Sequence, residues 1–120
     1  IIAEGSIINA ARIENSIVGI RSRIGHNSTL ISTYLMGNDY FETLDEIEHD
    51  REIGIPQLGI GNNCFIQNAI IDKDCRIGND VRIVGGTHLE DADHPLYTIK
   101  EGVIVIKKGS VIENGFTLGT

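Results

Sequence analysis

Aliphatic residues recur at an almost constant spacing through the middle of this 120-residue chain. Consecutive members are six residues apart, with one step that can be read as five. The positions are Ile60, Ile66, Ile71 or Asp72, Ile77 and Ile83. This spacing matches neither the 3.6-residue period of a helix nor the two-residue alternation of a plain strand. It is typical of hexapeptide repeats in a parallel β-helix, in which each short strand supplies one inward aliphatic side chain before the chain turns a corner.

The same rhythm occurs before and after this stretch. A shift of 53 residues places Ile13 on Ile66, and the same shift places Arg23 on Arg76. The predicted inward residues upstream are Ile7, Ile13, Val18, Ile24, Leu30 and Met36, and those downstream are Ile106, Ile112 and Leu118. We therefore predict one all-β solenoid domain over residues 1–120. Its hand is not fixed by the spacing, because parallel crossovers are right-handed by default.

Three of the predicted turns share a signature, in which Gly follows the inward Ile and Asn or Asp comes next. They are Ile24-Gly25-His26-Asn27, Ile60-Gly61-Asn62-Asn63 and Ile77-Gly78-Asn79-Asp80. Gly, Asn and Asp are the residues that best tolerate a positive φ. We therefore expect the backbone to bend sharply at these corners.

Two segments interrupt the repeats and are predicted as inserted loops, at residues 37–59 and 84–103. The first is acidic, and Phe41, Leu44 and Ile47 stand at helix-like spacing within it, which suggests a short helix. An acidic run of this kind is more often a solvated face than a binding surface. Loops that leave a rigid scaffold are nevertheless where function tends to lie.

The formal net charge of −7 disfavours broad attraction to nucleic acid or to anionic membranes. No apolar run approaches the roughly 18 residues of a membrane span, and no signal-peptide pattern opens the chain. We therefore expect a soluble, unexported protein without nucleic-acid or membrane partners. The chain does not begin with Met and its first residues already fit the repeat, which suggests that an N-terminal part is missing.

Cysteine and histidine give little sign of metal chemistry. Cys64 and Cys75 form no CxxC pair and are expected to be reduced and buried. The four histidines, which could also serve as general bases, are His26, His49, His88 and His94. The last two share one loop without an evident third ligand, so we expect no metal site.

The basic residues are more informative in so acidic a chain. Lys73 and Lys108 both lie where a strand gives way to a turn, so stacked coils could bring them to one edge. Two ammonium groups at one edge would suit a phosphate. Spacing alone also allows the alternative that both are solubilising surface lysines.

Several segments resemble one family, the C-terminal domain of ADP-glucose pyrophosphorylase (glucose-1-phosphate adenylyltransferase) of the cyanobacterial and plant type. The most specific are Leu35-Met36-Gly37-Asn38-Asp39-Tyr40-Phe41-Glu42, Ala69-Ile70-Ile71-Asp72-Lys73 and Gly102-Val103-Ile104-Val105-Ile106-Lys107-Lys108. The resemblance implies a left-handed parallel β-helix of hexapeptide repeats with two inserted loops. It also implies a regulatory and oligomerisation domain over residues 1–120, with the N-terminal nucleotidyltransferase domain absent from this chain.

In the family, the full-length enzyme makes ADP-glucose and pyrophosphate from ATP and glucose 1-phosphate, with Mg²⁺, for glycogen or starch synthesis. The resemblance places no catalytic residue, cofactor or metal in this domain. It implies activation by 3-phosphoglycerate, inhibition by orthophosphate, and contact with the enzyme's own N-terminal catalytic domain in a homo- or hetero-tetramer. The expected location is the cytoplasm of a bacterium or, in a plant or alga, the plastid stroma.

The two regulatory lysines of the family fall on Lys73 and Lys108, and the acid before the first falls on Asp72. Arg76 and Lys100 are expected to assist in binding the effector. The chain departs from the family pattern in the 84–101 loop and at Lys107, where the family has a hydrophobic residue.

Two other functions stay open at this point. A hexapeptide-repeat acyltransferase using acetyl-CoA would work as a trimer, with one indispensable His between subunits. A purely structural solenoid would pair through the exposed edges of its terminal coils.

Overall fold

The computed structural model describes residues 7–8, 12–38, 45, 48–49, 52 and 58–119. In this part of the chain the strands are two to four residues long and are separated by tight turns. They are β1 (Ile7–Ile8), β2 (Arg12–Glu14), β3 (Ile17–Val18), β4 (Arg23–Ile24), β5 (Thr29–Ile31), β6 (Tyr34–Leu35), β7 (Gly59–Ile60), β8 (Phe65–Gln67), β9 (Ala69–Ile71), β10 (Arg76–Ile77), β11 (Arg82–Val84), β12 (Ala92–Asp93), β13 (Tyr97–Lys100), β14 (Val103–Ile106), β15 (Val111–Ile112) and β16 (Thr117–Leu118).

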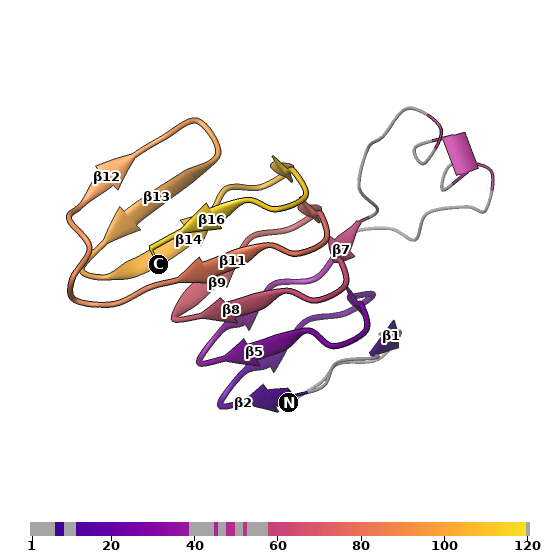
Figure 1. Cartoon of the computed structure of the whole chain (residues 1–120), viewed down its shortest axis with the longest axis horizontal. Coiled ribbons are helices and arrows are strands. Elements are labelled where there is room, and N and C mark those ends of the chain that lie inside the picture. Colours follow the sequence, from indigo (N-terminus) through magenta and orange to yellow (C-terminus); the bar gives the residue numbers. More distant parts are fainter. Residues whose placement is uncertain are drawn as a thin grey trace.

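Successive coils stack so that each adds one strand to each of three sheets (Figure 1). The first sheet has the order β1-β4-β7-β10-β15, and the second has the order β16-β11-β8-β5-β2. The third sheet has the order β12-β13-β14-β9-β6-β3. Pairing is parallel throughout the coils. Among the described strands, the antiparallel pairs are β12 with β13 and β13 with β14, at one end of the third sheet. The predicted all-β parallel coil is confirmed.

One aliphatic column runs up the inside of each sheet. The fully buried members include Val18, Ile24, Leu30, Ile60, Ile66, Ile71, Ile77, Ile83, Ile104, Ile106 and Ile112. Most of the predicted inward series is therefore confirmed. Burying one such side chain contributes about 1.5–3 kcal/mol, so these columns hold the coils together.

Met36 was predicted to face inward, and this is wrong. Its side chain is 37% exposed, and Leu35 is the buried residue. Leu35 pairs with Val18 below and with Ile71 above, both of which are inward. The step into the third sheet is therefore five residues in the three coils without an insertion at this point, and Ile71 rather than Asp72 is inward for the same reason. The side chain of Ile7 is outside the described residues, and Ile8 in the same strand packs against the core.

The Gly-Asn corners are built as a hydrogen-bonded ladder between coils. Asn62 Oδ1 accepts from the backbone N–H of His26 at 2.8 Å, and Asn79 Oδ1 accepts from that of Asn62 at 2.9 Å. Asn114 Oδ1 continues the ladder by accepting from the N–H of Asn79 at 2.7 Å. We call this column of His26, Asn62, Asn79 and Asn114 the asparagine corner.

The predicted positive φ falls on the residue after the ladder position. Asn27, Asn63 and Asp80 have φ of 59°, 58° and 58°. The preceding glycines serve a different purpose, because a Cβ at Gly78 would overlap Asn114 Oδ1 in the next coil. Glycine there makes room for the ladder.

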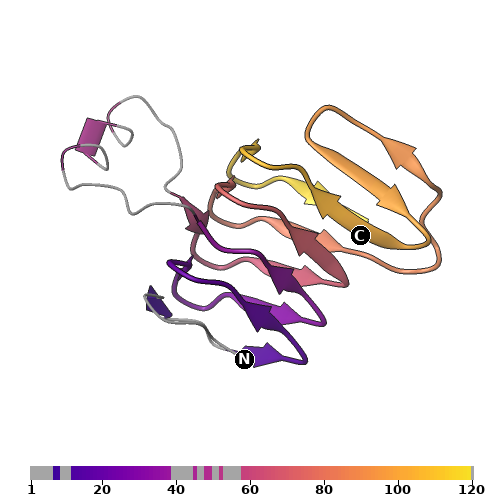
Figure 2. The ribbon, with the colours of Figure 1, turned by 180° about the vertical axis from the view of Figure 1, so that it is seen from behind.

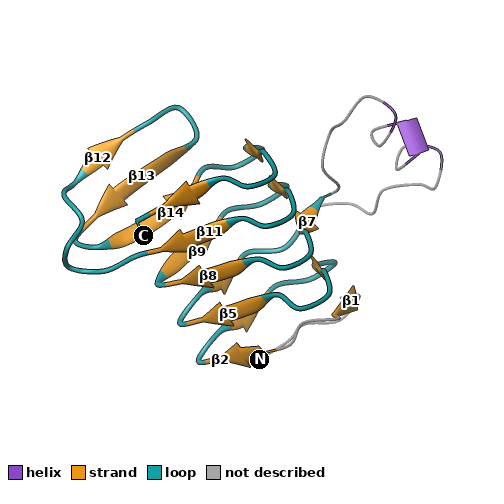
Figure 3. Cartoon of the chain, viewed as in Figure 1, coloured by secondary structure: helices purple, strands orange, loops and turns teal. Residues whose placement is uncertain are grey.

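The two insertions leave the stack at different places. Within the first, the described residues Asp45, Glu48, His49 and Glu52 are helical and exposed (Figure 3), whereas Phe41, Leu44 and Ile47 lie outside the described residues. The second insertion forms the antiparallel hairpin β12–β13, which continues the third sheet beyond β14 (Figure 2). The repeats did not predict this hairpin.

Both cysteines are free and buried, as predicted. The thiol of Cys64 donates to the Gly78 carbonyl and that of Cys75 to the Lys107 carbonyl, each at 3.1 Å. Burial raises the pKa of both thiols, that of Cys75 to about 11. Among the described residues, no helix is long and apolar enough to span a bilayer.

Candidate functional site

Lys73 and Lys108 occupy the same position in consecutive turns. The register of β9 with β14 places Ile71 opposite Ile106, and the Gly109 N–H donates to the Lys73 carbonyl at 3.0 Å. Adjacent strands lie about 4.8 Å apart, so residues 35 apart in sequence become neighbours. The prediction that stacking brings these two exposed lysines to one edge is confirmed. We call residues 72–74 and 107–109 the lysine corner.

Asp72 shapes the lower of these two turns. Its carboxylate accepts a hydrogen bond from the backbone N–H of Lys73 at 2.7 Å, and its own N–H donates to the Ile106 carbonyl. Asp74 then takes a φ of 59°, and Gly109 takes 74° in the turn above. Asp72 therefore acts on Lys73 through the backbone, by fixing the turn from which the side chain projects.

Lys107 is tied to the hairpin. Its Nζ lies 2.8 Å from Asp93 Oδ1, and the Thr98 hydroxyl donates to the same oxygen at 3.1 Å. The hydrogen bond from Lys107 holds the pKa of Asp93 below its usual value. The backbone N–H of Lys107 also donates to the Leu96 carbonyl at 2.9 Å. The hairpin thus contacts the lysine corner, a contact that the sequence patterns did not predict.

The other two candidate residues are placed differently. Arg76 begins β10, just after the lysine corner, between Gly59 of β7 and Val111 of β15. It is partly buried and remains close to Lys73 along the chain. Lys100 pairs with Val103, at the end of β13 away from the lysine corner. A four-residue strand spans about 10 Å, so Lys100 is not brought to Lys73.

The two corners carry different side chains in equivalent places. An amide ladder occupies the asparagine corner, whereas Lys73 and Lys108 lie one above the other in the turns that follow β9 and β14. Two ammonium groups in neighbouring turns would suit a phosphate, because each could give it a charge-assisted hydrogen bond.

The histidines show no shared site. His88 Nε2 lies 2.9 Å from the Gly119 carbonyl, and His94 stacks on Tyr97 with ring centroids 4.5 Å apart. His26 and His49 are exposed on other parts of the chain. Within the residues that the structure describes, no three His, Cys, Asp or Glu side chains are grouped to hold a metal ion.

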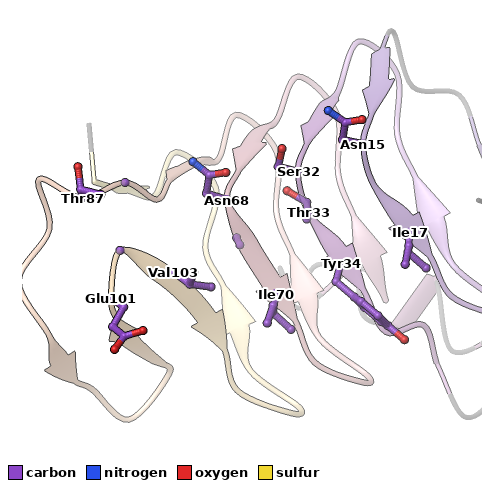
Figure 4. Close-up of a pocket in the computed structure, with 13 residues that line it drawn as sticks. Asn15, Ile17, Ser32, Thr33, Tyr34, Asn68, Ile70, Thr87, Glu101 and Val103 are labelled. Atoms are coloured by element: carbon purple, nitrogen blue, oxygen red, sulfur yellow. The ribbon is translucent and has the colours of Figure 1, made fainter.

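An open groove of about 480 Å³ lies on the outer surface of the third sheet (Figure 4). Ile17, Tyr34, Ile70 and Val103 form its apolar floor, one from each of four neighbouring strands. Ile17 and Tyr34 are more than 40% exposed. This apolar surface was missed from the sequence, because only the inward positions of the repeat were examined for hydrophobicity.

Two further apolar side chains are exposed in the column of turns that includes the lysine corner. Ile20 and Met36 are also exposed, in the turns directly below Lys73. Their turns join the same column, since the Asn38 N–H donates to the Ile20 carbonyl and the Asp74 N–H to the Gly37 carbonyl. The two lysines thus lie in the same column of turns as the exposed Ile20 and Met36.

A family model described as the GLGC left-handed parallel beta-helix domain matches residues 1–117 of the chain. The chain belongs to this family. The family is the C-terminal domain of ADP-glucose pyrophosphorylases, which are glucose-1-phosphate adenylyltransferases and hence nucleotidyltransferases. The left hand of the coil follows from this membership, and the resemblance in the sequence is confirmed. The match favours this family over the acyltransferase alternative.

Proposed function

We propose that the chain is a regulatory and oligomerisation domain of a glucose-1-phosphate adenylyltransferase, and that its lysine corner binds the anionic effector. The observation that carries the proposal is the stacking of Lys73 on Lys108 in a domain of this family. Effectors of the 3-phosphoglycerate and orthophosphate type carry the phosphate that such a pair would hold. The full-length tetrameric enzyme would make ADP-glucose for glycogen or starch synthesis.

Each residue of the corner has a distinct part in this proposal. Lys73 and Lys108 contact the phosphate, and Asp72 holds the turn that presents Lys73. Arg76, at the start of the next strand, would assist with a larger effector. Lys100 lies at the far end of its hairpin and is left out of the site.

The exposed apolar face supports a second element of the proposal, the docking of the nucleotidyltransferase domain on the third sheet. Contiguous exposed apolar surface commonly marks a contact with another domain or protein. The lysine corner would then lie at the margin of that contact. An effector that binds one arrangement of the two domains better than another shifts the enzyme toward that arrangement.

Catalysis itself would belong to the nucleotidyltransferase domain. Mg²⁺ would be bound there, since the described residues of this chain offer no group of ligands for it. This chain would supply effector binding and contacts between subunits.

The test is the rate of ADP-glucose formation by the full-length enzyme, with and without 3-phosphoglycerate and orthophosphate. Lys73→Ala and Lys108→Ala are expected to keep the basal rate and to lose most of the response to both effectors. Lys100→Ala removes the same charge from an exposed position remote from the corner, and it should respond as the wild type does. A normal response in both corner variants would disprove the site, and an enzyme that makes no ADP-glucose would disprove the function.

A further inference from the structure

The Asp93–Lys107 ion pair lies at the proposed effector site, although Asp93 belongs to the hairpin. Lys107 precedes Lys108 in the upper turn, and the Asp93 carboxylate lies 2.8 Å from its ammonium group. The Asp93 side chain is 79% exposed and that of Lys107 is 39% exposed, so the pair faces solvent. The ion pair therefore belongs to the same turn as Lys108.

The hairpin is held against this turn by more than one contact. The Leu96 carbonyl accepts from the Lys107 N–H at 2.9 Å and from the Ser110 hydroxyl at 3.0 Å. Thr98, on the neighbouring strand of the hairpin, donates to the Asp93 carboxylate. Asp93 is therefore placed by its surroundings and does not reach Lys107 by chance.

We propose that Asp93 is an internal competitor for the anion that binds the lysine corner, because its carboxylate occupies the Lys107 ammonium that a phosphate would otherwise share. This inference rests on the proposed function, since it assumes that the corner binds anions. Asp93 would set the affinity of the site through Lys107. A neutral residue at this position would leave the Lys107 ammonium group available to the phosphate.

The competition has a reciprocal consequence for the hairpin. A phosphate that draws Lys107 away from Asp93 weakens the attachment of β12, and any contact that tightens β12 weakens phosphate binding by the same factor. Amide exchange of His94, whose N–H donates to the Tyr97 carbonyl next to Asp93, should therefore speed up when phosphate binds.

The test is an NMR titration of the 120-residue chain with inorganic phosphate at constant ionic strength, which can follow weak binding. An exposed ion pair of this kind is worth little, so Asp93→Asn is expected to tighten phosphate binding by about two- to fivefold. Glu90→Gln removes the same charge from the same insertion and should bind phosphate as the wild type does. In a Lys107→Gln background, Asp93→Asn should have no further effect.

Equal binding by Asp93→Asn, Glu90→Gln and the wild type would overturn the competitor role. If that binding is still lost in Lys73→Ala and Lys108→Ala, the proposed effector site stands. If Asp93→Asn tightens binding through Lys107 while the two alanine variants bind normally, the competitor role stands and the lysine pair is wrong. An absence of phosphate binding in every variant would overturn both.

Discussion

The asparagine corner and the lysine corner have the same construction but carry different side chains. Each is a column of turns, with one residue above another in successive coils. At the asparagine corner, each of the three asparagine side chains accepts from a backbone N–H of the neighbouring coil, so stacking stabilises the solenoid. At the lysine corner, stacking places Lys73 and Lys108 one above the other without such a ladder between them. The first column therefore serves the fold, whereas we propose that the second binds a ligand.

The magnitudes support this distinction. A hydrogen bond of the asparagine type contributes about 0.5–1.5 kcal/mol net, and each rung of the ladder adds one. Replacing one exposed lysine in a turn usually changes stability by no more than about 0.5 kcal/mol. Variants at the asparagine corner should therefore lose more stability than variants at the lysine corner.

The largest effect is expected below the asparagine corner, at Ile77. This side chain is fully buried immediately before the Gly78-Asn79 turn. Ile77→Asp loses the apolar contact and buries a carboxylate, so the free energy of unfolding should fall by at least about 4 kcal/mol. Urea unfolding followed by circular dichroism measures the change. Ile77→Val, the matched control, should lose about 0.5–1.5 kcal/mol, and an equally small loss in the Asp variant would show that Ile77 is not core.

The next effect compares a glycine that is needed for space, Gly78, with one that is needed for its positive φ, Gly109. Gly78→Ala should cost about 1–3 kcal/mol, because the new Cβ overlaps the Asn114 side chain and backbone. Gly109, in the lysine corner, has open space around it and needs only its φ of 74°. Gly109→Asn should therefore cost less, because Asn tolerates that conformation. Equal losses of unfolding free energy in the two variants would contradict this account of the asparagine corner.

A smaller effect is expected when one rung of the ladder is removed. Asn79→Ala leaves the Asn62 N–H without its acceptor and should cost about 0.5–1.5 kcal/mol. Hydrogen exchange gives the local measurement, in which the Asn62 amide should exchange faster than in the wild type. Unchanged exchange at Asn62 would mean that the ladder bond contributes nothing in solution.

Much of the fold could be predicted from the sequence, because the residues at the hexapeptide spacing are the residues that the coil buries. Met36 was misassigned because the coil repeat is seventeen residues, as the pairing of Ile13 with Leu30 shows, rather than eighteen. One step in each coil without an insertion is therefore five residues, so a strict count of six residues per step loses the register. The hand of the coil came from the family and not from the spacing.

The candidate site could be predicted only in part. Lys73 and Lys108 were recognisable, because equal positions in a repeat become neighbours when coils stack. The Asp93–Lys107 pair was not, because it depends on the register of an antiparallel hairpin that follows no repeat. The same register places Lys100 at the far end of its strand. Local pairing in an insertion depends on its own turn and cannot be extrapolated from the coils.

The most direct test of the central claim is the urea midpoint of the chain with and without inorganic phosphate at matched ionic strength. Phosphate should stabilise the wild type and Lys100→Ala, because a ligand that binds the folded state raises its stability. Without phosphate, the unfolding free energies of Lys73→Ala and Lys108→Ala should lie within about 0.5 kcal/mol of the wild-type value, and phosphate should not shift their midpoints. If both variants are stabilised as much as the wild type, the lysine corner is not the anion site.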